Sequence, residues 1–332
     1  MRNREALAKG TKGWSRLAKN SQPTPGDVHV SRPLTNFGIA YIQRSGFISS
    51  QVFSAIPVSH KNDQYWQMSR DDFFRDEARP RAPGQRSAGG GFTLSQGNYN
   101  CVVEAYHTTI DDQTRGNQDD EVQLDRAASE LVMQKCLLRR ERKFMSSFFT
   151  SGVWGVDITP GTLWSAGAST PQNDVEVGKL AIMQRTGQKP NTLVLGAQTF
   201  SALKNNAEIK ARFMYTTAAS ITKEMLAAYF EVERIVVAEA VWQAALEGAT
   251  AVPQFIGGKH ALLCYTDPNP TLMSLTAGIT FNWSAFSGGQ DGFRVKRWRE
   301  EGVESDFIEG QMASDMKVVA PDCGYFFNNV VA

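Results

Sequence analysis

The chain has 332 residues, with 35 lysines and arginines against 34 aspartates and glutamates and a formal net charge of +1. This length suits two domains or one elaborated domain, and the balanced charge does not favour a dedicated nucleic-acid binder, which usually carries a basic excess. The sequence contains no run of about 20 apolar residues that could span a membrane and no apolar secretory signal at its N-terminus.

An N-terminal arm is predicted over residues 1–58. Basic residues dominate the segment before Asn20, and the prolines Pro23, Pro25 and Pro33 exclude a long helix. A disordered basic tail is the alternative interpretation of this segment. Apolar stretches follow and lead to Val58, where the arm ends.

An extended two-stranded loop is predicted over 59–112, with its ribbon at 64–110. Two strand-like arms flank a tip that is rich in charge, proline and glycine. The returning arm alternates, with Tyr99, Cys101 and Val103 on one side. Because a two-stranded ribbon alone is only marginally stable in water, we expect it to lie on a neighbouring molecule. This indicates assembly rather than catalysis.

The longest helix is predicted over 119–151, where the sequence contains no glycine or proline. Acidic residues crowd its start and basic residues its later half, the order that the helix dipole favours. Apolar residues recur every seven positions and predict one continuous apolar stripe. They are Leu124, Leu131, Leu138 and Met145. A helix of this length is about 45 Å long, which indicates a structural spine.

Short alternating elements between residues 178 and 278 predict an α+β layer domain. Strands are expected at 191–196, 235–238 and 261–265, and helices at 177–185, 197–213 and 222–229. Thr222 is a candidate N-cap for the last of these helices. From residue 292 onward the sequence again predicts strands.

No catalytic or metal-binding pattern is found in the sequence. The segment 257–259 resembles the end of a phosphate-binding loop, but Pro253 replaces its first glycine, so a structural turn is predicted. The histidines and cysteines lack metal-ligand spacing, and the cysteines are expected to be reduced and buried. We expect no enzyme, cofactor or metal site. An enzyme built on His260, Cys264 and Asp267 is the alternative, although no spacing supports it.

The order of these parts resembles the major capsid proteins of tailed bacteriophages, whose fold is shared with encapsulins and herpesvirus capsid floor domains. The resemblance covers most of the chain from about Ile56. Its carriers are the segments QYWQMSRDDFFRDEARPRAPG, KPNTLVLGAQTFSAL, ITKEMLAAYFEVERIVVAEAVW and TDPNPTLMSLTAGITFNW, and the closing Gly324-Tyr325. These are loose patterns, and their collinear order carries the resemblance.

The resemblance implies an α+β fold, the tailed-phage major capsid protein fold, in five parts. They are the N-terminal arm at 1–58, the extended two-stranded loop at 59–112, a peripheral domain at 113–177 that includes the long spine helix at 119–151, an axial domain at 178–280, and return strands of the peripheral domain at 281–332. The implied function is a structural subunit that assembles into hexamers and pentamers of an icosahedral shell around a double-stranded DNA phage genome. An encapsulin-like compartment shell is the alternative, and the long arm counts against it.

The partners that the resemblance implies are other copies of the chain, a separate scaffolding protein, a portal, a decoration protein and packaged DNA in non-specific contact. A scaffold supplied in trans is expected because only residues 1–58 precede the loop, whereas fused scaffolds are long helical extensions. The implied locations are the virion and, during assembly, the host cytoplasm. No membrane partner is expected.

Two sets of site residues follow from the resemblance. Contacts between subunits are predicted for Arg70, Phe73, Phe74, Arg75, Arg79, Arg81, Arg86 and Phe92. Lumen-facing basic residues are predicted at Arg2, Arg4, Lys9, Lys12, Arg139, Arg140, Arg142 and Lys143. Relatives that cross-link their shells use a lysine on the loop, but no lysine lies between Lys61 and Lys135 here. We therefore expect a shell held without covalent links.

Overall fold

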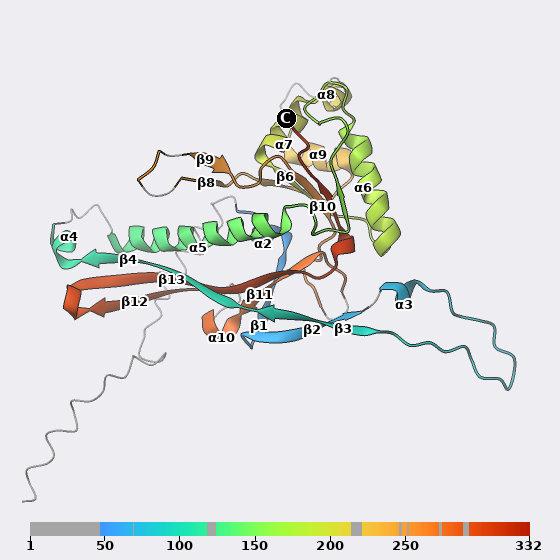
Figure 1. Cartoon of the computed structure of the whole chain (residues 1–332), viewed down its shortest axis with the longest axis horizontal. Helices are drawn as coiled ribbons and strands as arrows, with labels where there is room; N and C mark the ends of the chain where they lie inside the picture. Colours follow the sequence, from blue (N-terminus) through green and yellow to red (C-terminus); the bar gives the residue numbers. More distant parts are fainter. Residues whose placement is uncertain are drawn as a thin grey trace, which may run out of the picture.

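The computed structural model describes residues 47–68, 70–117, 124–213, 221–245, 248–250, 252–271, 274–287 and 292–332. Within them the chain forms two main β-sheets with helices, which confirms the predicted α+β class. The first sheet and the long helix α5 form an elongated lower layer, and the second sheet with its helices stands above one half of it (Figure 1). The basic arm residues at positions 2, 4, 9 and 12 lie outside the described residues.

The first sheet is organised around β13 (Ser305–Val318). β4 (Val102–Asp111) pairs along one edge of it, and β12 (Phe293–Glu300) and β11 (Gly278–Trp283) pair in succession along the other edge, all antiparallel. β1 (Ser54–Val58) completes the sheet parallel to β11. This sheet therefore joins segments that are far apart in the sequence into one layer.

The predicted long helix is α5 (Leu124–Phe148), and it covers the first sheet. A Cβ on Gly310 of β13 would lie 3.2 Å from Val132 Cγ2, so the glycine lets α5 pack closely on the sheet at this position. Buried residues of α5 recur at every fourth position: Ala128, Val132, Cys136, Arg140, Phe144 and Phe148. The predicted seven-residue stripe is confirmed only in part: Met145 is buried and Leu124 packs on the core, but Leu131 is 38% exposed.

The reason is that α5 serves two cores. A helix turns once per about 3.6 residues, so a four-residue repeat moves the buried face gradually around the helix axis. The first turns of α5 pack on the first sheet through Val132 and Leu137. The last turns pack beneath the second sheet through Phe144 and Phe148.

The second sheet is buried on both faces. Its strand order is β5 (Val156–Ile158), β14 (Gly324–Phe327), β10 (Ala261–Cys264), β6 (Thr192–Gly196) and β7 (Arg234–Ala238). The helices α6 (Pro171–Thr186), α7 (Ala197–Asn205), α8 (Ala207–Phe213) and α9 (Lys223–Phe230) pack on one face, and the end of α5 packs on the other. Every residue of the three central strands is buried, which is typical of strands covered on both sides.

Most of the elements predicted for this layer are present. The strands at 191–196, 235–238 and 261–265 are confirmed. The N-cap is also confirmed, since the Thr222 hydroxyl accepts the Met225 N–H at 3.3 Å. The single helix predicted at 197–213 is wrong. Asn206 interrupts it in an extended conformation, and its Oδ1 accepts the Glu208 N–H at 2.9 Å, which starts α8.

β14 corrects the expectation that all of 281–332 returns to the first sheet. It pairs with β10 on one side and with β5 on the other, inside the second sheet. The chain reaches it where the Tyr265 N–H donates to the Cys323 carbonyl at 2.9 Å. The run of buried residues in β14 lacks polar alternation, which is typical of a central strand.

The other described elements are short. They are α2 (Ser49–Val52), α3 (Arg70–Phe74), α4 (Asp112–Gly116), α10 (Ser284–Ser287), the 3-10 turns η1 (Glu301–Val303) and η2 (Pro321–Cys323), the ribbon of β2 (Asn62–Met68) and β3 (Leu94–Asn100), and the hairpin of β8 (Val241–Gln243) and β9 (Pro253–Phe255). All four cysteines are free and buried, as predicted. No helix in the described ranges is long and apolar enough to cross a membrane.

A buried carboxylate ties the start of the described chain to α5. Glu141 is inaccessible to solvent, and its carboxylate accepts the Ile48 N–H at 3.1 Å and the Ser49 N–H at 2.9 Å. Burial raises the pKa of Glu141, and these hydrogen bonds oppose the rise. With the segment fixed in this way, Phe53 enters the core, where its ring centroid lies 5.0 Å from that of Phe144.

We expect Glu141→Ala to lower the free energy of unfolding by about 2–4 kcal/mol, because it leaves two buried backbone N–H groups without acceptors. Glu141→Gln keeps an acceptor oxygen and should cost less. Chemical denaturation of unassembled subunits, followed by far-ultraviolet circular dichroism, measures both changes. Equal stability of the wild type and the alanine variant would contradict the role assigned to this carboxylate.

Candidate assembly surfaces

The ribbon of β2 and β3 is shorter than the predicted ribbon at 64–110. Its strands pair over seven residues each, and the returning chain then continues as β4, which pairs with β13 instead. The change of partner occurs at Cys101, whose N–H donates to the Lys61 carbonyl at 2.8 Å. The neighbouring Asn100 N–H donates to the Asp315 carboxylate at 2.9 Å. The second half of the predicted return arm is therefore part of the first sheet.

The ribbon has one covered face and one open face. The rings of Tyr65 and Tyr99 lie against the first sheet, with centroids 5.4 and 4.5 Å from that of Phe281. Trp66 and Leu94 point the other way, because side chains alternate along a strand, and they are 57% and 47% exposed. Large apolar side chains in open positions are typical of a contact surface.

α3 holds the base of the loop on the body of the subunit. Arg70 Nη1 lies 3.0 Å from Asp322 Oδ2, and the Phe74 ring lies beside Gly187 at the end of α6. Within the loop, Arg75 lies 3.9 Å from Asp72. Of the predicted contact residues, Arg70 and Arg75 thus form ion pairs inside their own subunit.

The other predicted contact residues in the loop have no such partner. After α3 the chain runs without regular structure to β3 and projects away from both layers (Figure 1). Its aromatic residue is Phe92, which is 60% exposed, and Phe73 and Phe74 at the end of α3 are 54% and 58% exposed. Its basic residues Arg79, Arg81 and Arg86 make no ion pair or hydrogen bond with any described residue.

The basic residues predicted on α5 do not form one exposed surface, which corrects the expectation that they face the shell interior together. Arg140 is buried, and its guanidinium carbon lies 4.9 Å from the centroid of the Phe293 ring. Arg139 Nε lies 3.1 Å from Glu104 Oε1 on β4. Both side chains are therefore used within the subunit.

Arg142 and Lys143 also point in different directions from α5. The Arg142 guanidinium lies 3.8 Å from the centroid of the Trp242 ring on β8, and Lys143 is half-buried. Consecutive residues on a helix point about 100° apart, so basic residues that are adjacent in sequence reach different neighbours. The basic cluster on α5 could be recognised in the sequence, but the burial and partners of each residue depend on the elements packed around the helix.

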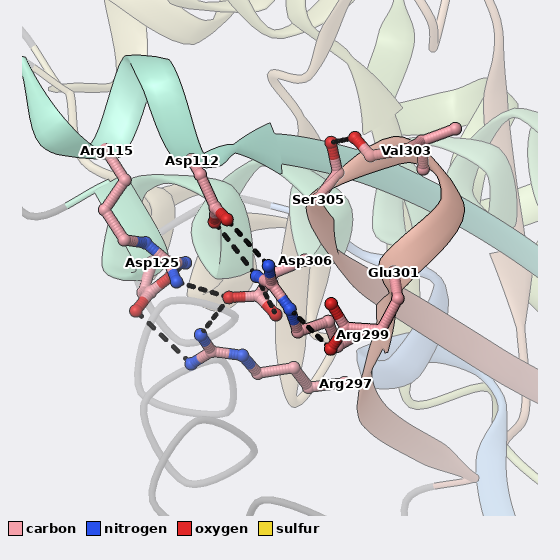
Figure 2. A network of polar contacts seen from close by, with 9 residues as sticks. All are labelled: Asp112, Arg115, Asp125, Arg297, Arg299, Glu301, Val303, Ser305 and Asp306. Atoms are coloured by element: carbon pink, nitrogen blue, oxygen red, sulfur yellow. Dashed lines mark hydrogen bonds and ion pairs between the residues drawn. The ribbon is translucent and has the colours of Figure 1, made fainter.

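A network of arginines and aspartates fixes the far end of the first sheet. Figure 2 shows Asp306 of β13 between Arg115 of α4 and Arg297 of β12, both of which donate to its carboxylate, the latter at 2.7 Å. The same two arginines lie 2.9 and 3.3 Å from the oxygens of Asp125 on α5. This network therefore ties two strands, α4 and the start of α5 together.

Sequence reasoning missed this network. Arg299 extends it with hydrogen bonds of 2.9 and 2.6 Å to the two oxygens of Asp112. One signal was available, because alternation along β12 places Arg297 and Arg299 on the same face as the buried Val295. Burial alone would raise the pKa of Asp306, but its arginine partners outweigh burial and hold the pKa below its ordinary value.

The residues of the alternative enzyme do not form a site. His260 precedes β10 and Cys264 ends it, and the His260 ring packs 5.4 Å from that of Phe326. Burial raises the pKa of Cys264 to about 12, which is unsuitable for a reactive thiolate. Asp267 accepts the N–H of Asn269 in its own turn. In the part of the chain that the structure describes, no group of three histidines, cysteines or carboxylates could hold a metal ion.

Comparison with solved structures defines the class of protein. A phage-related protein from Bordetella bronchiseptica RB50 aligns with a TM-score of 0.69 at 22% identity, over 91% of this chain and 98% of that one. An encapsulin from Synechococcus elongatus aligns with a TM-score of 0.53 at 13% identity, over 94% of each chain. The fold is the shell-forming fold of phage capsid proteins and encapsulins.

Sequence comparison distinguishes between these two groups. A major capsid protein of the Burkholderia phage BcepMu is 24% identical over 219 residues, which cover 64% of this chain and 70% of that protein. The family described as phage major capsid protein E matches residues 153–321, about half of the chain. The chain belongs to this family, and it is a structural subunit of a phage capsid shell. The phage interpretation is therefore better supported than the encapsulin one.

We expect Asp306→Asn to destabilise the subunit by about 1–3 kcal/mol near neutral pH, because a neutral amide no longer balances the arginines around it. The folded-state pKa of Asp306 lies below its unfolded value of about 3.9. Its ionised carboxylate therefore stabilises the fold above that pH, and the stabilisation is lost as the pH falls through the folded-state pKa.

Thermal unfolding of both proteins as a function of pH measures this effect. The difference between them should be constant near neutrality and disappear in acid. A matched control is Glu130→Gln on the surface of α5, where the ion pair of 3.4 Å with Arg126 is exposed and contributes less than about 1 kcal/mol. A difference for Asp306→Asn that stays constant into strong acid would contradict the prediction.

Proposed function

We propose that copies of this chain form pentameric and hexameric rings, and that the rings close into an icosahedral shell around a double-stranded DNA phage genome. In each ring the extended loop lies over the adjacent subunit. The observation that carries this proposal is the projecting segment between α3 and β3, which leaves apolar and basic side chains without partners in their own subunit. Such side chains gain free energy when another molecule covers them.

Charge supports a neighbouring copy as the molecule beneath the loop. The turn between β12 and β13 lies at the opposite end of the lower layer from the loop (Figure 1) and presents Glu300, Glu301 and Glu304, all exposed. In a head-to-tail ring two different surfaces of the subunit meet. Arginine–carboxylate pairs are suited to fixing the register of such a contact. The basic loop of one copy and the acidic turn of the next are the partners in this proposal.

The remaining partners belong to the same proposal. Contact with packaged DNA is made through phosphates and does not depend on sequence. Because Arg139 pairs with Glu104, Arg140 is buried and Arg142 stacks on Trp242, this contact is assigned to the basic residues of the N-terminal arm. Assembly takes place in the host cytoplasm with a separate scaffolding protein and a portal, and a decoration protein is a further candidate partner.

Deleting residues 72–91 tests the role of the loop. The deletion joins β2 to β3 through residues 69–71 and 92–93, a length that suits a hairpin connection, so the subunit should fold. We expect helix content by circular dichroism that falls only by the part of α3 that the deletion removes, but no stable shells by electron microscopy and sedimentation. Gln85→Ala with Ser87→Ala is the matched control, because it alters the same segment and keeps its phenylalanines and arginines. Normal particles from the deletion would refute the proposal.

The shell should contain no covalent cross-links between subunits. A cross-link of the lysine type needs an amine nucleophile on the loop, and no lysine lies between Lys61 and Lys135. Arginine cannot replace it, because its guanidinium stays protonated. Boiled particles on a denaturing gel should give one band at the monomer mass of 36.7 kDa. Particles treated with an added cross-linker show that the gel resolves oligomers, and a ladder without that reagent would contradict the prediction.

A further inference from the structure

α6 and the β8–β9 hairpin lie on opposite sides of the second layer (Figure 1), and each carries an open apolar patch. One patch lies on the outer face of α6, and the other lies on the β8–β9 hairpin, which projects over α5. Neither patch takes part in the loop contact described above. In both places, apolar side chains are more exposed to water than is usual for a surface that stays uncovered.

α6 is apolar on two opposite faces. Val175 and Ile182 are buried in the core beneath it. Val177, Leu180 and Met183 lie on the outer face at helical spacing and are 49%, 57% and 42% exposed. The other exposed residues of α6 are Asn173, Glu176 and Gln184, so this face carries little charge. Helices that face water usually present a charged face, and a second apolar stripe therefore indicates a second packing partner.

The β8–β9 hairpin is too small to be stable by itself. It consists of three residue pairs and pairs with no other described strand, and isolated hairpins are marginal in water. One face is held on α5 by the stacking of Trp242 on Arg142. Val241 and Phe255 are paired across the hairpin and point away from α5, because side chains alternate. They are 47% and 45% exposed.

We infer that α6 of one subunit packs on the β8–β9 hairpin of the next subunit around a ring. This inference rests on the proposed ring assembly and names a second contact within it, separate from the loop. A ring contact is formed by two different patches on opposite sides of one subunit, which is the arrangement that α6 and the hairpin have. The α6 patch offers three exposed apolar side chains, and the open face of the hairpin offers two.

Charge at the rims of the patches agrees with this pairing. Glu176 is exposed at the edge of the α6 stripe, where it also forms an ion pair with the buried Lys179 of its own helix. Arg142 is exposed beside the hairpin without an ion pair to any described residue. When the apolar centres meet, a carboxylate and a guanidinium lie at the edges of the contact. Opposite charges in such positions favour the correct partner and register.

Cysteine cross-linking in assembled particles tests the contact. The native cysteines are all buried, and burial raises the pKa of Cys323 to about 12, so they react slowly. A chain that carries Leu180→Cys and Val241→Cys should give a ladder of covalent oligomers after treatment of its shells with a short bis-maleimide. Each single variant should give only the monomer band.

A control pair separates this contact from random proximity. Leu131→Cys with Val241→Cys places one thiol on exposed α5, outside both patches, and should give no ladder. Met183→Cys with Phe255→Cys provides a second pair for the same contact if the first pair lowers the yield of shells. Loss of shells from both pairs, with circular dichroism unchanged, would also support an assembly contact at these patches.

The inference is overturned if shells form and both test pairs give no more cross-linking than the control pair. A different failure belongs to the proposed function. If the wild-type chain forms no closed shells at all, the ring assembly itself is wrong, and this result is obtained before any cysteine is introduced. The two outcomes are therefore distinguishable.

Discussion

The subunit depends on the hydrogen-bonded pairing of β13 with three other strands. β4 occupies one of its edges over ten residues, and β12 and β11 share the other. The same strand contains Gly310, where α5 makes its close approach. Because β4 is fixed along its whole length, the loop leaves the body from a rigid strand, and the change of partner at Cys101 sets its point of departure. A loop that starts from such a fixed strand can contact another molecule without a change in the fold of its own subunit.

α5 joins the two layers because its buried face turns from one core to the other. Buried carboxylates hold this arrangement in two places. Near the start of the helix, Asp306 accepts hydrogen bonds from Arg115 and Arg297. Near its end, Glu141 accepts the backbone N–H of Ser49 at the start of α2. Both carboxylates satisfy several donors at once, which is the condition under which a buried charge stabilises a fold. The long helix is therefore fixed at both ends as well as along its apolar face.

Much of the fold could be predicted from the sequence because its signals are local. The absence of glycine and proline marked the long helix, the run at 192–196 marked a buried strand, and Thr222 marked a helix start. The rest depends on contacts between distant segments. Nothing near Cys101 shows that the returning strand changes its partner. Arg140 lies in a run of basic residues and is nevertheless buried by its neighbours.

The candidate assembly surfaces were likewise predictable where the signal is local and not where it depends on distant segments. The loop was predictable because its composition does not suit a compact domain, and its phenylalanines are exposed as a contact surface requires. The Asp306 network could not be predicted in full, because its members come from α4, α5, β12 and β13. The apolar stripe of α6 has the same period as an ordinary core face. Only the structure shows that its second face is open.

The position of β14 has a consequence for the order of events during synthesis. β5, β6, β7 and β10 all precede β14 in the chain, yet β14 lies between β5 and β10 in the second sheet. Until the ribosome has released Gly324–Phe327, one edge of β10 has no partner and the core beneath α6 is incomplete. A nascent chain that has not yet been extended past Phe327 therefore lacks a finished upper layer, and packing of the core beneath α6 has to wait for this late segment.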